Sequence, residues 1–250
     1  MGRIFAIPDI HGRLDLLEKL LNILFTQHTL DLTVDKIVFL GDMIDRGPHS
    51  KQVLDRIRAL EALHPGHVIV LAGNHEWLAI DAYINPTENN QYIWHRNGGV
   101  QTLESFGIYV ALNTPDMYSR TEGWYAHGKL PDDYIRWMGK LPLQYEEAGF
   151  FFSHAPVPKE NRRDIMWRGT NTFAKRELIW TYDRDEAEIA RIHSNGVIGV
   201  CGHIHRLDFN EMSPRFYDHY IFADSGCGCA DYAPLVAVNV KTREVIYAWP

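Results

Sequence analysis

The chain has 250 residues, of which 46% are hydrophobic and 12% aromatic, and this composition excludes a disordered protein. The formal net charge of -7 argues against nucleic-acid binding, because no stripe of basic residues is available to displace the counterions of a phosphate backbone. We therefore expect no nucleic acid among the partners.

Neither export nor membrane insertion is expected. No apolar run reaches the roughly 18 residues that a spanning helix needs, and the apolar segment before Pro8 is too short for a signal peptide. The chain has three cysteines, and two of them, Cys227 and Cys229, are too close for an ordinary disulfide, so we expect reduced thiols. The sequence predicts a cytoplasmic protein without a membrane partner and leaves its oligomeric state open.

The N-terminal part repeats a strand, a polar loop and a helix three times. Short apolar runs at 3–7, 36–40 and 67–71 predict buried strands. Leucines between Leu14 and Leu24 recur at a spacing that places them on one face of a helix, and a second helix is expected through 53–60. This order favours an α/β fold with parallel strands covered by helices.

From about residue 84 to 147 the pattern changes to aromatic and polar segments interrupted by proline and glycine. We expect a mainly helical insertion or lid there, with helices near 100–106 and 132–140. Strands are predicted again at 149–152, 196–201, 220–223, 235–240 and 244–248, and the last two alternate as in an antiparallel hairpin. No linker is visible, so residues 1–250 are expected to form one domain.

Five polar segments follow predicted strands, at the edge of the sheet where ligands collect in such folds. They are Asp-Ile-His-Gly at 9–12, Gly-Asp-Met-Ile-Asp-Arg-Gly at 41–47, Gly-Asn-His-Glu at 73–76, Ser-His-Ala at 153–155 and Gly-His-Ile-His-Arg at 202–206. One such segment would mean little, because single histidines and Asp-Gly turns are common. Five in series predict a binuclear metal hydrolase.

The candidate metal ligands in these segments are carboxylates, an amide and imidazoles: Asp9, His11, Asp42, Asn74, His154, His203 and His205. Asp42 is the natural bridging ligand. Asp9 and His11 would bind one ion, joined by His205 if its segment is extended, and the remaining three residues would complete the second site. Oxygen and nitrogen ligands without thiolate suit manganese, iron or zinc better than calcium, and we expect two manganese ions, with iron or zinc as alternatives.

The order of these segments resembles that of the calcineurin-like metallophosphoesterases, especially the bacterial and bacteriophage lambda-type serine/threonine protein phosphatases. The segments 94–99, 178–180 and 223–226 also resemble parts of the phage enzymes. The bacterial branch usually has Gly-His-Thr-Pro where this chain has Gly-His-Ile-His, which supports His205 as an extra ligand. The resemblance implies a metallophosphoesterase αββα sandwich of two mixed sheets flanked by helices, with a helical insertion.

The resemblance also implies catalytic roles. His75 would be the general acid, Asp45 would orient it, and Arg46 would bind phosphate bidentately rather than form a surface salt bridge. A second phosphate-binding arginine of the phage enzymes is missing, because Tyr182 stands in its place. The candidate replacements are Arg168, Arg184 and Arg206, and the alternative is that Arg46 alone binds the phosphate.

We therefore expect a phosphomonoesterase that acts on phosphoserine and phosphothreonine in proteins and accepts small phosphorylated substrates. A metal-bridging hydroxide would attack phosphorus directly. One alternative is a symmetrical dinucleoside tetraphosphatase, or another phosphodiesterase, of the same fold. Another is a non-catalytic metal-binding or scaffold protein, against which the presence of His75, Asp45 and Arg46 counts, because metal binding alone does not require them.

Overall fold

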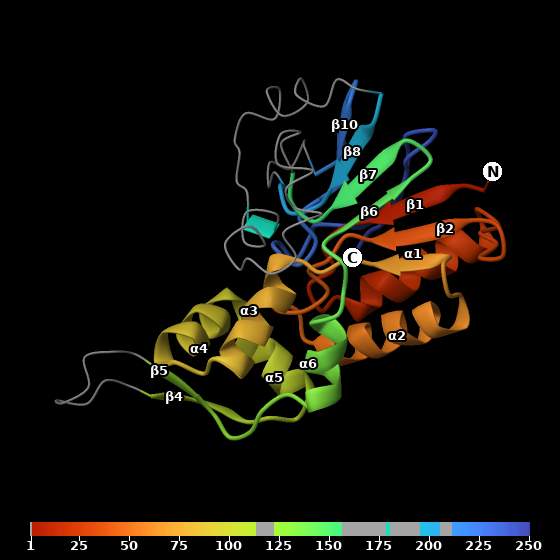
Figure 1. Ribbon diagram of the computed structural model, residues 1–250. Helices are drawn as coiled ribbons and strands as arrows, with labels where there is room; N and C mark the ends of the chain where they lie inside the picture. The colour runs from red at the N-terminus through yellow and green to blue at the C-terminus, as the bar shows by residue number, and fades with distance from the viewer. Residues whose placement is uncertain (1, 114–122, 157–178, 181–195, 206–211) are drawn as a thin grey trace.

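The computed structural model describes residues 2–113, 123–156, 179–180, 196–205 and 212–250. Two five-stranded sheets lie face to face in this part of the chain (Figure 1). Both combine parallel and antiparallel strand pairs, so the predicted α/β sandwich of two mixed sheets is confirmed.

The first sheet has the spatial order β12 (Glu244–Ala248), β11 (Leu235–Asn239), β1 (Ile4–Ile7), β2 (Lys36–Phe39) and β3 (Val68–Val70). Phe5 and Ile7 of β1 pack toward the helices α1 (Leu14–Thr26) and α2 (Ser50–Leu63), and Ile4 and Ala6 face the second sheet. This alternation is the two-residue period of a strand buried on both faces. The three predicted strands and the C-terminal hairpin are confirmed.

The second sheet has the spatial order β6 (Gln144–Glu147), β7 (Phe150–Ser153), β8 (Ile198–Cys201), β10 (Tyr220–Phe222) and β9 (Arg215–Tyr217). Phe150 and Phe152 join the core between the sheets, and Phe151 points to the opposite side, where it contacts Ile179. Neither β6 nor β9 is predicted from the sequence, because both are edge strands and carry no continuous apolar run.

The chain segment that connects the first sheet to the second is mainly helical, as predicted, but it differs from the predicted helical insertion in two ways. It contains α3 (Asn74–Ile84), α4 (Glu88–Trp94), the π-helix η1 (His95–Gly99), α5 (Val100–Ser105) and α6 (Asp132–Met138). It also holds an antiparallel hairpin of β4 (Val110–Asn113) and β5 (Gly123–Ala126), and its last residues form β6. Figure 1 shows these helices beside the sandwich, with the hairpin extending from them.

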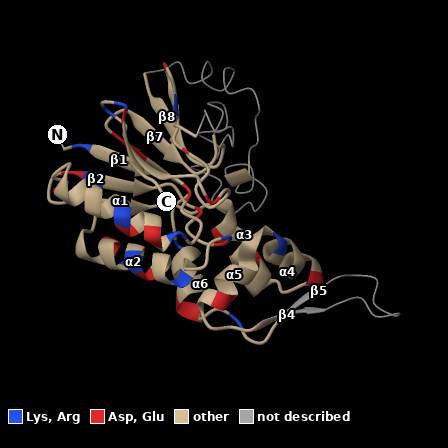
Figure 2. Cartoon of the chain, turned by 180° about the vertical axis from the view of Figure 1, so that it is seen from behind, with Lys and Arg blue, Asp and Glu red and all other residues tan. Residues whose placement is uncertain are grey.

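Charged residues of both signs are interspersed along α1, α2 and α6 (Figure 2). Arg56 of α2 pairs with Glu18 of α1, and Arg58 pairs with Asp133 of α6. These contacts connect the helices that cover the first sheet to the inserted helices. Among the described helices, none is long and apolar enough to cross a membrane.

Candidate binuclear metal centre

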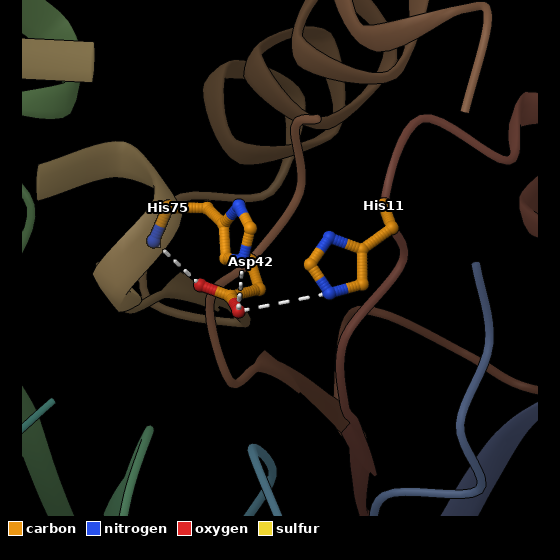
Figure 3. A group of neighbouring side chains, drawn as sticks. All are labelled: His11, Asp42 and His75. Carbon is orange, nitrogen blue, oxygen red and sulfur yellow. Dashed lines mark hydrogen bonds and ion pairs between the residues drawn. The ribbon is translucent and has the colours of Figure 1, made fainter. Parts of the chain in front are cut away.

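Asp42 lies at the centre of a buried cluster of imidazoles. Its Oδ2 is 3.7 Å from Nε2 of His11 and 3.8 Å from Nε2 of His75, and its Oδ1 is 3.4 Å from Nε2 of His154. Figure 3 shows the carboxylate beside the rings of His11 and His75, with dashed lines to both residues. Asp42 belongs both to the group with His11 and His75 and to a second group with His154 and His203, and the ligand atoms of each group lie within 4.8 Å of one another. One carboxylate shared by two groups is the arrangement that can bridge two ions.

Asp9 and Asn74 adjoin these groups. Oδ2 of Asp9 is 3.8 Å from Nε2 of His11, and its Oδ1 accepts a hydrogen bond from the His203 amide at 3.0 Å. Oδ1 of Asn74 is 2.8 Å from Nε2 of His154. The structure therefore gathers six of the seven predicted ligands, namely Asp42 and five residues around it.

His205 lies outside both groups. Its Nδ1 is 3.1 Å from Oδ2 of Asp224 and 3.9 Å from Sγ of Cys229. His203 has a φ of 63°, in the left-handed region, so the segment is not extended there. The expected alternation that would turn His203 and His205 to the same side therefore does not apply.

Backbone carbonyls orient two of the imidazoles. Nδ1 of His11 is 2.9 Å from the carbonyl of Ile44, and Nδ1 of His154 is 2.9 Å from the carbonyl of Leu40. An Nδ1–H that donates to a carbonyl turns Nε2 toward the cluster, as in metal-binding histidines. Nε2 of His11 is buried and has no hydrogen-bond partner among the described residues, so a cation fits this position.

The acidity of the cluster also fits a divalent cation. Burial, together with Asp224 and Asp42, raises the pKa of Asp9 to about 8. Burial would lower the pKa of His154, but Asp42 outweighs it and raises that pKa to about 10. Without a cation, these raised pKa values favour protonation of Asp9 and His154. A metal ion would replace such protons, because it neutralises the same charge and binds the deprotonated ligands.

A glycine and a glutamate hold the Asp42 loop in place. A Cβ on Gly73 would lie 2.1 Å from Oδ1 of Asp42, so only glycine allows this approach. The Glu76 carboxylate accepts hydrogen bonds from the amides of Asp42, Met43 and Gly73 at 2.8 to 2.9 Å. The segments 41–47 and 73–76 are thereby joined, and they support Asp42 at its φ of 51°.

The residues predicted for catalysis form a connected group beside Asp42. Nδ1 of His75 is 2.7 Å from Oδ2 of Asp45, and Nη2 of Arg46 is 3.1 Å from Nε2 of His75. Burial opposes protonation of His75, but Asp42 and Asp45 together raise its pKa above the ordinary value. Within the described part of the chain Arg46 forms no ion pair with a carboxylate, and its other contact is Sγ of Cys229. A guanidinium without a carboxylate partner can take up an anion.

Asp45 is held from the inserted helices, a feature that the sequence analysis missed. Oγ1 of Thr102 donates to Oδ1 of Asp45 at 2.6 Å, and Nε1 of Trp94 lies 3.1 Å from both carboxylate oxygens. The carbonyl of Gly98 accepts a hydrogen bond from the Arg46 amide at 3.2 Å. The resemblance of the segment 94–99 marked Trp94 and Gly98, but no local pattern marks Thr102.

The predicted substrate-binding residues Arg168 and Arg184 lie outside the described residues, as do Arg206 and Tyr182. Their assignment stays a prediction. Asp224 and Cys229 contact His205 and Arg46, and they belong to a C-terminal segment to which the sequence analysis gave no role in the site.

Residues 2–207 match the calcineurin-like phosphoesterase family. Serine/threonine-protein phosphatase 2 of Escherichia coli is 33% identical over 181 residues, which cover 72% of this chain and 68% of that protein. The symmetrical bis(5'-nucleosyl)-tetraphosphatase of Methylococcus capsulatus is 26% identical over 157 residues, 62% of this chain. This match spans 43% of the tetraphosphatase. A further match, to serine/threonine-protein phosphatase 1 of Salmonella typhimurium, spans 38% of that protein.

Solved structures agree on the fold. A protein serine/threonine phosphatase of Saccharomyces cerevisiae superposes with a TM-score of 0.61 at 16% identity, over 99% of this chain and 79% of that one. The family match covers most of the sequence, and the buried histidine and aspartate groups fit the divalent metals that this family uses. The chain therefore belongs to the calcineurin-like metallophosphoesterases and is a hydrolase.

Proposed function

We propose that the chain is a metal-dependent phosphomonoesterase that removes phosphate from phosphoserine and phosphothreonine in proteins. The observation that carries this proposal is the buried Asp42, whose Oδ2 faces Nε2 of His11 and whose Oδ1 faces Nε2 of His154. His75, Asp45 and Arg46 form a connected group beside it. The match to a bacterial serine/threonine phosphatase over 72% of the chain supports this substrate class.

Two divalent ions would be held by the gathered ligands, with manganese first and iron or zinc as alternatives because the ligands are oxygen and nitrogen. Asp9 and His11 would bind one ion, Asn74, His154 and His203 the other, and Asp42 both. We retain His205 as a ligand of the first ion through Nε2, because a carboxylate facing Nδ1 is a common support of metal-binding histidines. When bound, such a pair of ions supplies Lewis acidity and a nucleophile derived from water.

His75 would protonate the leaving oxygen of the serine or threonine side chain, because an alkoxide is a poor leaving group. A guanidinium only donates hydrogen bonds, so Nε2 of His75 accepts from Arg46 and Nδ1–H donates to Asp45 in the substrate-free geometry. Phosphate bound by Arg46 would compete for the same N–H group. Asp45 would keep the ring aimed and favour its protonated form.

A symmetrical dinucleoside tetraphosphatase is the second candidate, because a relative of that name matches 62% of the chain. The two can be separated with the purified protein and added manganese. We expect hydrolysis of p-nitrophenyl phosphate and a higher kcat/KM for a phosphoserine peptide than for diadenosine tetraphosphate. A clear preference for the dinucleotide would refute the phosphoprotein assignment and leave the hydrolase chemistry intact.

The bridging role of Asp42 has a direct test in metal content. Asp42→Ala should lose both ions on gel filtration, because each ligand group depends on this carboxylate. Asp133→Ala, which removes an exposed carboxylate on α6, is the matched control and should keep both. Retention of two ions by Asp42→Ala would contradict the bridging role.

A further inference from the structure

A cavity of about 260 Å³ opens beside Arg46 and also contains Arg13. Gly47, Gly228 and Asp231 form other parts of its lining. The amide of Gly47 donates to the carbonyl of His11 at 3.0 Å, so the loops that carry Arg13 and Arg46 are hydrogen-bonded to each other. A second arginine therefore lines the same cavity as the one proposed to bind the phosphate that is removed.

Asp15 orients Arg13 but bonds only two of its three guanidinium nitrogens. Nε and Nη2 of Arg13 donate to the two carboxylate oxygens of Asp15 at 2.9 and 2.7 Å. The Arg13 side chain is 16% exposed and that of Asp15 is 55% exposed, so solvent screens their attraction. No described residue accepts a hydrogen bond from Nη1 of Arg13, and the N–H groups of this guanidinium nitrogen are available to an incoming anion.

We propose that Arg13 binds the carboxylate of an acidic residue next to the phosphorylated serine or threonine. This inference rests on the proposed phosphoprotein phosphatase function and names a preference within it. Arg46 would take the phosphate, and Arg13 would take the neighbouring carboxylate across the cavity. Charge-assisted hydrogen bonds from a guanidinium to a carboxylate are directional, so the contact selects for position as well as charge.

The cavity suits a side-chain carboxylate better than a nucleoside polyphosphate. The described residues that line it include no aromatic ring on which a nucleobase could stack. Asp231 also lines the cavity, and its repulsion of a ligand grows with the negative charge that the ligand carries. A single carboxylate meets the least repulsion and gains the Arg13 contact.

The test uses two phosphoserine peptides that differ only in having Glu or Gln beside the phosphorylated residue. With the manganese-loaded protein at low ionic strength, kcat/KM should be about tenfold higher for the Glu peptide, as expected for one partly exposed charged hydrogen bond. Arg13→Gln should bring this ratio close to one. Arg13→Lys, which keeps the charge and loses the fork, should give an intermediate ratio.

Arg56→Gln is the control, because it removes an equal charge from α2, outside the cavity, and should keep the wild-type ratio. Equal kcat/KM for the two peptides in the wild type would overturn the inference without reference to any variant. The inference would also be overturned if Arg13→Gln kept the wild-type ratio of kcat/KM for the two peptides and selectively lost hydrolysis of diadenosine tetraphosphate. Arg13 would then contact the dinucleotide and not an acidic side chain. If the wild type hydrolyses p-nitrophenyl phosphate but neither peptide, the proposed function fails as well, and this result differs from equal rates on both peptides.

Discussion

Nδ1 of His75 lies 2.7 Å from Oδ2 of Asp45, and both side chains are buried. The carboxylate fixes the direction in which Nε2 of the ring points. Metal binding alone does not require this pair. Its removal should therefore lower activity without lowering the metal content of the protein.

His75→Asn should lower kcat by at least about 100-fold, the usual contribution of a general acid, and should retain both metal ions. The measurement is the steady-state rate on a phosphoserine peptide, with metal analysis of the same sample. His64→Asn, at a partly exposed position at the end of α2, should behave as the wild type. Full activity in His75→Asn would show that the leaving group departs without this acid.

Thr102→Val should move the acidic limb of the rate profile to higher pH. Burial already raises the pKa of Asp45, and the hydroxyl of Thr102 opposes this rise by donating to the carboxylate. Without the hydroxyl the pKa of Asp45 rises further, so Asp45 becomes protonated and stops orienting His75 at a higher pH than in the wild type. Stability should fall by about 1 to 3 kcal/mol, the cost of an unsatisfied buried group.

The profile of kcat against pH for Thr102→Val and the wild type measures the predicted shift of the acidic limb. Thr26→Val, at the exposed end of α1, is the control for the change of side chain and should leave the limb in place. A uniform loss of rate in Thr102→Val, with no shift of the limb, would mean that Thr102 only supports the fold.

Gly98→Ala should impair catalysis through Arg46. Gly98 has a φ of 105°, and a Cβ there would lie 2.4 Å from the Arg46 amide. Gly107 has a φ of 74° and open space around it, so Gly107→Ala imposes similar backbone strain without the clash. Gly107→Ala should lose about 1 to 2 kcal/mol of stability, and Gly98→Ala should lose more, because the Arg46 backbone must also shift.

Only Gly98→Ala should also lose activity, by about tenfold to 100-fold in kcat/KM, because small displacements of a positioning group are costly to turnover. Thermal unfolding and kinetics with p-nitrophenyl phosphate on both variants provide the comparison. Equal activity in the two variants would remove Gly98 from the account of how Arg46 is placed.

Asp35 should stabilise the fold in a way that depends on pH. Its carboxylate accepts hydrogen bonds from the Arg3 backbone and guanidinium, at 2.6 to 3.1 Å, and from the Asp31 amide. Burial acts to raise the pKa of Asp35, but these donors outweigh it and hold the pKa below its ordinary value. A carboxyl with a lowered pKa in the folded state stabilises above its unfolded pKa of about 3.9, and this contribution disappears as pH falls through the folded pKa.

Asp35→Asn should therefore be less stable than the wild type by about 1 to 3 kcal/mol at pH 7, and the difference should shrink as the pH falls below about 4. Urea unfolding at several pH values measures it, and Asp218→Asn at an exposed position should show no such difference. A gap that stays constant with pH would mean that the Asp35 charge contributes nothing.

The sequence predicts the ligand edge well because a parallel arrangement needs only local patterns. Each apolar run of the first sheet ends in a polar segment, and the carboxyl ends of parallel strands meet at one edge. Asp9, Asp42 and Asn74 must then approach one another, whatever the details of the loops. The same reasoning cannot place residues whose position depends on a single backbone angle.

His205 and Thr102 illustrate this limit. The left-handed φ of His203 changes the direction of the following residues, and no residue type near it requires that conformation. Thr102 reaches Asp45 across 57 positions of sequence through the packing of an inserted helix, which leaves no periodic signal. Side chains supplied by remote segments become visible only in the folded chain.

The loop from Gly41 to Gly47 carries Asp42, Asp45 and Arg46 at positive φ, between 51° and 71°. Each costs a non-glycine residue about 1 to 2 kcal/mol relative to an ordinary conformation. The contacts of Glu76, Thr102 and Gly98 with this loop offset that cost, and all of them come from other segments. Because this geometry depends on contacts with other segments, we expect turnover to cease on warming before the two sheets unfold.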